Sequence, residues 1–395
     1  MSASTKTMLD RARELEKEII ELRRYLHRHP ELSFAETETA KLSAEKLKEL
    51  GFEVKTGIAK TGVLGDLGSG KRMVAIRADM DALPILESNK TPYHSGNQGV
   101  MHACGHDAHV SCGLAAAKLL AKMDSLPGKL RMLMQPAEED TDSEGKSGAM
   151  RMVEEGAMDG VAAVIGLHMD ASLPAGKVAI MPGPVMAACD GFKLTIQGKG
   201  GHGAYPESTV DSVVIAAQVI SAIQQIVSRR MSALDPAVIT IGSIHSSSSR
   251  GNVISDSVEL LGTIRSFTEA VRVKLRNELE KACSLVKALG GEFTIEYELG
   301  YPPTVNDANV SEVLKQAACD LIGVENVITL PLKTWSEDFS ILAQAAPGAF
   351  MFLGGEMKDY QRSHHSPDFD IDESGLYLGP AILAETALRL MKSEN

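Results

Sequence analysis

The densest group of residues able to do chemistry is the short segment MHACGHDAH, in which Cys104 and His106 are separated by Gly105 alone. In an extended segment the side chains at i and i+2 face the same way, so both could reach one metal ion. Gly105 lets the backbone pass close to that ion. Thiolate and imidazole are preferred ligands of borderline-soft divalent ions. This pattern predicts a metal site, and the alternative interpretation is a polar loop with scattered histidines.

The second candidate is the adjacent pair Glu138 and Glu139 in the segment QPAEED, which follows an apolar, strand-like run. Adjacent side chains diverge, so one glutamate can bind a metal ion while the other faces a bound water and acts as general base. A solvated acidic loop is the alternative interpretation. The nearby cysteine and histidine cluster favours the catalytic one.

Further histidines fit the same site. His168 ends the apolar run VAAVIGLH, and the carboxyl end of a parallel strand is where an open α/β sheet places its ligands. Of the neighbours His364 and His365 only one need be a ligand. We expect His102 and His109 to support the site rather than to bind metal.

Two other motifs have competing explanations. Asp79 and Asp81 come at the end of the run RMVAIRAD, where aspartate commonly forms a turn. The segment GKGGHG matches the dinucleotide fingerprint GxGxxG formally, but Pro206 interrupts the helix that must follow and Asp211 is too close to bind the ribose. The glycines around His202 instead predict a loop that presents an imidazole.

The elements that must position these residues alternate between helix and strand up to about residue 184, which favours a largely parallel sheet with helices on both faces. Gly-Ser-Gly at 68–70 is interpreted as a hairpin turn. Helices are predicted over 8–28, 36–50, 108–123 and 146–155, and strands over 52–58, 61–68, 72–79, 129–135 and 161–168.

The pattern changes to βαββαβ between residues 190 and 301, which is the split ferredoxin-like order, and alternation resumes from about residue 304. We therefore predict an α/β protein of two domains. The catalytic domain, 1–188 and 303–395, has a mostly parallel mixed sheet flanked by helices. The other, 189–302, is an inserted ferredoxin-like α+β lid and dimerisation domain.

Composition limits the partners. The net charge of −12 argues against nucleic acid or an anionic membrane, which reward basic patches. Five cysteines without a CxxC pair favour a reducing cytoplasm over a disulfide framework. The N-terminus lacks an apolar signal core and no run of 18 apolar residues occurs, so we expect neither a signal peptide nor a membrane span. GxSxG and P-loop motifs are also missing from the sequence.

Ten motifs, in order, make the chain resemble the aminoacylase and carboxypeptidase-type dinuclear metallohydrolases, and above all their amidohydrolase branch with hippurate hydrolase and the auxin-conjugate hydrolases. The motifs span nearly the whole chain: RRYLHRHPELSFAE, IRADMDALP, MHACGHDAH, QPAEE, GLH, GKGGHGAYPE, GNVI, GTIR, SEDFS and HHSP. The resemblance implies two divalent metal ions per subunit, zinc or manganese with cobalt or nickel open. The implied ligands are Cys104, His106, Glu139, His168 and His365.

The resemblance also assigns catalytic roles. It implies that Glu138 is the general base and that Asp81 supports the site without binding metal, because the family's first metal motif lacks its usual histidine here. It implies that His202 stabilises the oxyanion, and that Asn252 and Arg265 help to hold the substrate's carbonyl and carboxylate.

The implied reaction is hydrolysis of an N-acyl-L-amino acid to a carboxylic acid and a free amino acid. The resemblance further implies a homodimer, with a higher oligomer left open, in which His202 serves the neighbouring subunit's site. The alternatives are a dipeptidase or carboxypeptidase of the same family and an inactive ligand-binding relative. Glu138 argues against the last, since binding alone requires no base.

Overall fold

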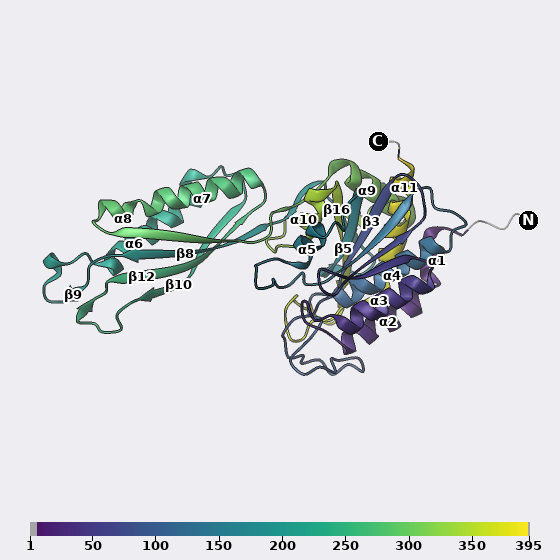
Figure 1. Cartoon of the computed structure of the whole chain (residues 1–395), viewed down its shortest axis with the longest axis horizontal. Helices are drawn as coiled ribbons and strands as arrows, with labels where there is room; N and C mark the ends of the chain where they lie inside the picture. The colour runs from purple at the N-terminus through teal and green to yellow at the C-terminus, as the bar shows by residue number, and fades with distance from the viewer. Residues whose placement is uncertain (1–5, 394–395) are drawn as a thin grey trace, which may run out of the picture. The chain divides into compact units, whose positions relative to one another are not determined.

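A computed structural model describes residues 6–393, which divide into two compact units (Figure 1). The first unit, here called the catalytic domain, contains the described residues up to Gly183, Val305–Pro331 and the described residues from Asp338 onward. The second unit, the inserted domain, contains Pro184–Thr304 and also Leu332–Glu337. The boundaries predicted for the inserted domain were 189–302, without the second segment.

The catalytic domain is built on an eight-stranded mixed sheet in the order β1-β2-β4-β3-β5-β16-β6-β15. The central pairs β3–β4, β3–β5 and β5–β16 are parallel, which confirms the predicted sheet class. Because helices cover both faces, these strands are buried along most of their length and read as continuous apolar runs. The strands are β1 Glu53–Ile58, β2 Gly62–Leu67, β3 Met73–Asp79, β4 Lys129–Gln135, β5 Val161–Pro174, β6 Val178–Ala179, β15 Val327–Ile328 and β16 Gly348–Glu356.

The helices of this domain are α1 Met8–Arg13, α2 Glu16–Arg28, α3 Thr37–Glu49, α4 His106–Ala121, α5 Gly148–Glu154, α9 Ala308–Ile322, α10 Phe339–Ala345 and α11 Leu378–Lys392, with short 3-10 turns at Val324–Asn326 and Glu373–Gly375. Helix α4 is apolar on nearly every face and contacts both α2 and α11. A helix of this kind belongs in a protein core, and its first residue, His106, is fully buried.

Two local predictions were wrong. The helix predicted over 8–28 is two helices, since Glu14 and Leu15 form a turn between α1 and α2. The glycines at 68–70 do not close a hairpin, because β4 lies between β2 and β3. The hairpin is β1–β2, and Ala59 and Lys60 form its turn with φ of 51° and 72°.

The predicted position of His168 at the end of its strand was also wrong. Strand β5 continues to Pro174, and His168 lies within it, opposite Phe352 of β16. The residues after His168 remain buried almost to the end of the strand, so β5 has the interior environment that keeps it paired.

The inserted domain has the predicted βαββαβ order, and its antiparallel sheet is arranged β10-β12-β8-β13. A smaller sheet pairs β9 with β11. The elements are β8 Ala188–Gln197, β9 Gly201–His202, a 3-10 turn Pro206–Ser208, α6 Ser212–Gln225, a π-helical segment Ile226–Arg230, β10 Ala237–Ser246, β11 Val253–Ile254, β12 Ser257–Ser266, α7 Glu269–Cys283, α8 Leu285–Ala288 and β13 Glu292–Leu299, while β7 Gly183–Met186 and β14 Thr304–Asn306 lie near the domain boundary.

Among the described residues one helical stretch, Ser212–Arg230, is long and apolar enough to cross a membrane by length and composition, and 33% of its most apolar 18 residues are buried. It consists of α6 and the π-helical segment that follows it. Helix length and composition alone therefore do not exclude a membrane span, although the sequence led us to expect none. A core helix of a soluble protein passes the same test. The inward residues Ile215, Val219 and Ile223 belong to the hydrophobic core of the inserted domain.

Candidate active site

Cys104, His106 and His168 bring their ligand atoms within 4.8 Å of one another. All three side chains are buried, and the Cys104 Sγ lies 3.5 Å from the His168 Nε2. The segment is not extended as predicted, because His106 begins α4 and Gly105 turns the chain with φ of 92°. A Cβ at Gly105 would lie 2.9 Å from the Cβ of Met169, so both conformation and space require glycine there.

The rings of His106 and His168 are oriented by carbonyl oxygens. The His106 Nδ1 lies 2.9 Å from the Asp81 carbonyl oxygen, and the His168 Nδ1 lies 2.6 Å from the Met169 carbonyl oxygen. Since a carbonyl only accepts, both Nδ1 atoms donate, and in the neutral rings Nε2 keeps its lone pair. Metal-binding histidines are held in this tautomer by such contacts. The His106 Nε2 makes no hydrogen bond to any residue between 6 and 393.

A second group of ligand atoms, also within 4.8 Å of one another, combines Cys104 with Glu139 and His365. The His365 Nε2 lies 3.1 Å from the Glu139 Oε1. His365 has φ of 62°, unusual for a residue with a side chain, and its N–H donates to the Ala103 carbonyl at 2.8 Å. Of the two neighbouring histidines, His365 belongs to this group, whereas the Ala171 N–H donates to the His364 Nε2 at 3.3 Å.

Local charge favours a cation at this point. Burial, then the charges of Glu139 and Glu138, raise the pKa of Cys104 well above its usual range. Burial alone would lower the pKa of His106, but Asp79 and Asp81 outweigh it and raise that pKa to about 10. A divalent cation satisfies the same negative field, so the donor set and its electrostatics fit a metal ion.

Glu138 is 5% exposed, and its carboxylate lies within 4.8 Å of ligand atoms of His106 and Glu139. Asp81 lies close by, and its Oδ2 accepts hydrogen bonds from the Glu139 N–H at 2.9 Å and from the Ser33 hydroxyl at 2.7 Å. These contacts suit a residue that supports the site.

Below this cluster lies a buried polar layer. The Met169 N–H donates to the His109 Nε2 at 2.8 Å, so the His109 Nδ1 is the donor to Asp79 at 2.7 Å. Both nitrogens of His109 are therefore engaged and neither is free for a metal. Arg77 donates to Asp79 at 2.9 Å and to Asp338 at 3.1 Å. Arg77 and Asp338 were not predicted, although a charged residue inside the apolar run RMVAIRAD was a signal.

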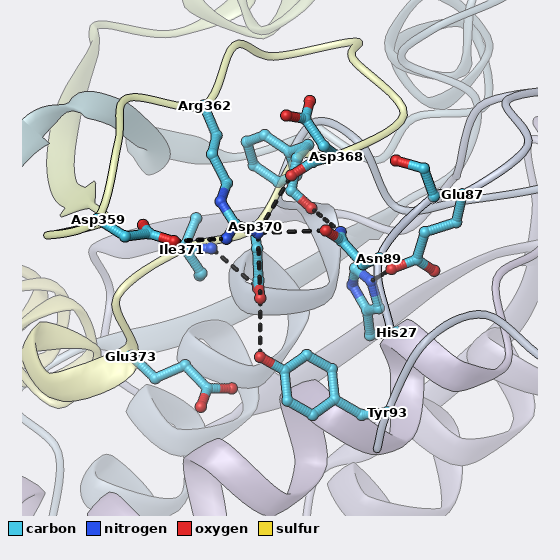
Figure 2. Close-up of polar contacts among 12 residues, drawn as sticks. His27, Glu87, Asn89, Tyr93, Asp359, Arg362, Asp368, Asp370, Ile371 and Glu373 are labelled. Atoms are coloured by element: carbon cyan, nitrogen blue, oxygen red, sulfur yellow. Dashed lines mark hydrogen bonds and ion pairs between the residues drawn. The ribbon is translucent and has the colours of Figure 1, made fainter. Parts of the chain in front are cut away.

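Two loops beside the site hold each other (Figure 2). The Tyr93 hydroxyl donates to Asp370 at 2.8 Å, and the Asn89 amide donates to the Phe369 carbonyl at 2.8 Å. Arg362 donates to the side-chain oxygen of Asn89 at 3.2 Å. The loop that carries His365 is thereby tied to the segment before the MHACGHDAH motif.

A fully buried arginine completes this connection. Arg23 of α2 lies 2.8 Å from Asp107, 2.9 Å from Asp370 and 3.2 Å from Glu373. Asp107 directly follows His106, so Arg23 joins both segments that carry candidate ligands. This cluster was not predicted from individual residues, and its one sequence signal was the motif that begins at Arg23.

The candidate residues of the inserted domain fall into two places. The β9–β11 pairing brings His202 beside Asn252, whose carbonyl accepts the Gly203 N–H at 2.9 Å. The His202 Nδ1 accepts the Ala204 N–H at 3.0 Å, so in the neutral ring Nε2 carries the proton, and the residue is exposed.

Arg265 lies far from that pair. Arg265 lies on β12, where it pairs with Cys189 of β8. Ser257, at the other end of β12, pairs with Gln197 of β8, close to β9 (Figure 1). The eight residue steps from Ser257 to Arg265 span about 27 Å at strand spacing. Within one chain, the structure thus brings His202 and Asn252 together but does not bring Arg265 to them.

A mixed α/β domain with converging thiol, imidazole and carboxylate ligands, interrupted by a ferredoxin-like domain, defines a two-domain metallohydrolase. The model of peptidase family M20/M25/M40 matches residues 75–389, and the chain belongs to this family. It is therefore a hydrolase, of a family whose named relatives act on amide bonds.

Relatives with different names match almost the whole chain. It is 40% identical to thermostable carboxypeptidase 1 of Saccharolobus solfataricus, with 95% of this chain and 96% of the relative covered. It is 39% identical to N-acetyl-L-cysteine deacetylase of Bacillus subtilis, with 96% and 90% covered. It is 38% identical to IAA-amino acid hydrolase ILR1-like 4 of Arabidopsis thaliana, with 94% and 86% covered.

Solved structures agree with the fold. A protein from methicillin-resistant Staphylococcus aureus superposes with a TM-score of 0.91 at 37% identity, covering 98% of this chain and 99% of that one. The YXEP protein of Bacillus subtilis, described as a dinuclear metal binding peptidase from the M20 family, gives 0.84 at 31% identity, with 96% and 99% covered.

Proposed function

We propose that this protein is a metal-dependent amidohydrolase that cleaves N-acyl-L-amino acids into a carboxylic acid and a free amino acid. The observation that carries the proposal is the cluster in which the buried Glu138 lies beside two overlapping ligand groups that share the buried Cys104. The relatives named as a deacetylase and as amino acid conjugate hydrolases support this substrate class.

Five side chains would hold two divalent cations: Cys104, His106, Glu139, His168 and His365. Bound cations of this kind lower the pKa of water and polarise a carbonyl. The cysteine favours zinc, whereas the histidines and carboxylate also admit manganese, and cobalt or nickel stay open. The relative described as a dinuclear metal binding peptidase supports the count of two.

The chain's own groups would carry the proton. Glu138 accepts a proton from the attacking water and returns it to the leaving amine. The His202 Nε2–H donates to the oxyanion that develops on the carbonyl. Asn252 and Arg265 bind the substrate's carbonyl and carboxylate, and Asp81 keeps His106 oriented.

Distances within the inserted domain favour a homodimer. A small substrate cannot reach from Arg265 to His202 of the same chain, since about 27 Å of strand lies between their ends of the domain. Two copies that exchange His202 would complete both sites symmetrically. The free cysteines among the described residues suit a cytoplasmic location, which we propose with the dimer.

A carboxypeptidase or dipeptidase activity is the second candidate, favoured by the 40% identity to thermostable carboxypeptidase 1. Both reactions release an amino acid with a free carboxylate and differ in the acyl part. The test is an activity screen after reconstitution with each metal, using N-acetyl, N-benzoyl and indole-acetyl amino acids together with dipeptides and longer peptides. Turnover of peptides alone would reject the first proposal, and binding without turnover of any substrate would indicate an inactive relative.

A further inference from the structure

The backbone on both sides of Glu138 is held by buried carboxylates. The Ala137 N–H donates to the Glu36 Oε1 at 2.8 Å, and the Glu139 N–H donates to the Asp81 Oδ2 at 2.9 Å. Both carboxylates are almost fully removed from solvent, and Glu36 has no exposed surface. Glu36 was not a predicted site residue, and it lies 101 residues from Ala137 in the chain.

The turn that these contacts hold is a strained one. Ala137 has φ of 45°, a left-handed conformation that costs a residue with a Cβ about 1–2 kcal/mol. Its carbonyl accepts the Gly148 N–H at 2.8 Å, so both polar backbone groups of Ala137 are engaged. A Cβ at Gly148 would lie 1.6 Å from the Pro136 carbonyl oxygen, so only glycine allows this close approach. Strained backbone of this kind persists where the surroundings over-determine it.

Glu36 is itself positioned for this contact rather than for its own helix. It is the N-cap residue of α3, yet its side chain makes no capping hydrogen bond. Glu31 accepts the N–H groups of Glu38 and Thr39 instead, at 3.0 and 2.8 Å. The second oxygen of Glu36 accepts the Thr61 hydroxyl at 2.5 Å, which fixes the carboxylate from the opposite side.

Burial of this carboxylate is unfavourable in itself. Burial, and then the charge of Asp81, raise the pKa of Glu36 to about 7. A purely packing role would be filled at lower cost by an apolar side chain. The acid is instead placed where its carboxylate accepts the backbone N–H of Ala137, the residue before Glu138.

We propose that Glu36 is a positioning residue for Glu138: by accepting the Ala137 N–H it holds the left-handed turn that directs the Glu138 carboxylate into the site. This inference rests on the proposed role of Glu138 as the base. Glu36 belongs to neither of the two candidate ligand groups that share Cys104. Its effect should appear in kcat rather than in KM or in metal binding.

The test compares Glu36→Ala with Glu36→Gln in the reconstituted full-length enzyme. Loss of the acceptor in Glu36→Ala should lower kcat by about 10–100-fold, as misplacement of a catalytic group does, with KM within about twofold. The amide oxygen of Glu36→Gln still accepts the Ala137 N–H, so this variant should keep kcat within about threefold of wild type. Zinc titration of the metal-free variants, followed by calorimetry, should give the wild-type stoichiometry in both.

Glu155→Ala is the matched control, because Glu155 accepts the N–H of another left-handed alanine, Ala59, in the turn between β1 and β2. We expect its kcat to be unchanged. If Glu36→Ala fails to fold, Thr61→Val against Thr61→Ser repeats the comparison one contact further out, with kcat lowered by valine and kept by serine.

A folded Glu36→Ala enzyme with wild-type kcat would overturn the inference. Equal losses in Glu36→Ala and Glu36→Gln, or loss of bound zinc, would also overturn it, since charge or metal binding would then be the cause. Failure of the proposed function is distinguishable, because the wild-type enzyme would then hydrolyse no N-acyl amino acid and Glu138→Gln would change nothing.

Discussion

The guanidinium of Arg23 lies 2.8 Å from the carboxylate of Asp107, and neither side chain has any exposed surface. Burial alone would raise the pKa of Asp107, but Arg23 and then His27 hold it well below its usual range. Asp107 is the second residue of α4 and follows the candidate ligand His106. Removing one partner of such a pair leaves an uncompensated buried charge, which is far more costly than losing the pair as a whole.

Arg23→Met should therefore lower the free energy of unfolding by about 3–5 kcal/mol. Urea denaturation of the metal-free protein measures this. Lys17→Met on the same helix is the control, because Lys17 is 88% exposed and its pair with Glu21 at 3.7 Å should contribute less than about 1 kcal/mol. Equal stabilities of Arg23→Met and wild type would show that the buried charges find other partners.

Glu138→Gln should lose turnover but keep its metals. Glutamine preserves the shape of the side chain but cannot accept the proton of water, while the five candidate ligands are untouched. We expect a fall in kcat on the order of a thousandfold or more. Steady-state kinetics and metal analysis are the measurements. Near-normal kcat would remove Glu138 from the role of base, and stoichiometric metal loss would make it a ligand.

Exchange of His202 between subunits predicts complementation. His202→Ala and Glu138→Gln homodimers should each be nearly inactive, whereas a mixed dimer would contain one site with both residues intact. Random pairing makes half of the dimers mixed, so about a quarter of wild-type activity should return on co-expression. Activity that stays at the level of the separate variants would show that His202 acts within its own chain.

The buried Glu36 predicts a pH dependence of stability. Its pKa is raised to about 7 from an ordinary value of 4.5, so the folded state holds this proton more tightly than the unfolded state. The contribution of Glu36 to the stability of the folded protein is fully present below its pKa in the unfolded chain. It is lost as the pH rises through its pKa in the folded protein. Between about pH 4 and pH 8, Glu36→Gln should gain about 3 kcal/mol relative to wild type, at 1.36 kcal/mol per unit. The measurement is urea denaturation of metal-free wild type and metal-free Glu36→Gln across this pH range. If the free energies of unfolding of the two proteins changed in parallel with pH, the prediction would be wrong.

The sequence predicted the candidate metal ligands better than it predicted the contacts that hold them in place. Cys104 and His106 were found because they share one short segment, and the order of helices and strands follows from local periodicity. The insertion of β4 between β2 and β3 was missed, since strand order in a sheet depends on pairings between distant segments. The contact of Glu36 with Ala137 is of the same kind.

The position of His168 along its strand was predicted wrongly for a different reason. His168 was expected at a strand end because the apolar run VAAVIGLH ends there, yet β5 continues beyond it in buried surroundings. The resemblance to a known family still assigned His168 as a ligand, since motif order survives where local geometry is misjudged. Arg23 shows the reverse case, in which a motif was noticed but its three acidic partners could not be inferred.

The left-handed backbone of His365 links the two ligand groups mechanically. Its N–H donates to the carbonyl of Ala103, the neighbour of Cys104, so a backbone hydrogen bond joins the loop of His365 to the turn of Cys104. Cys104 also belongs to both ligand groups. Filling one position would therefore order the ligands of the other, and two cations would bind cooperatively rather than as independent ions. Scarcity of metal would then divide the population into empty and fully loaded molecules, with few half-loaded ones.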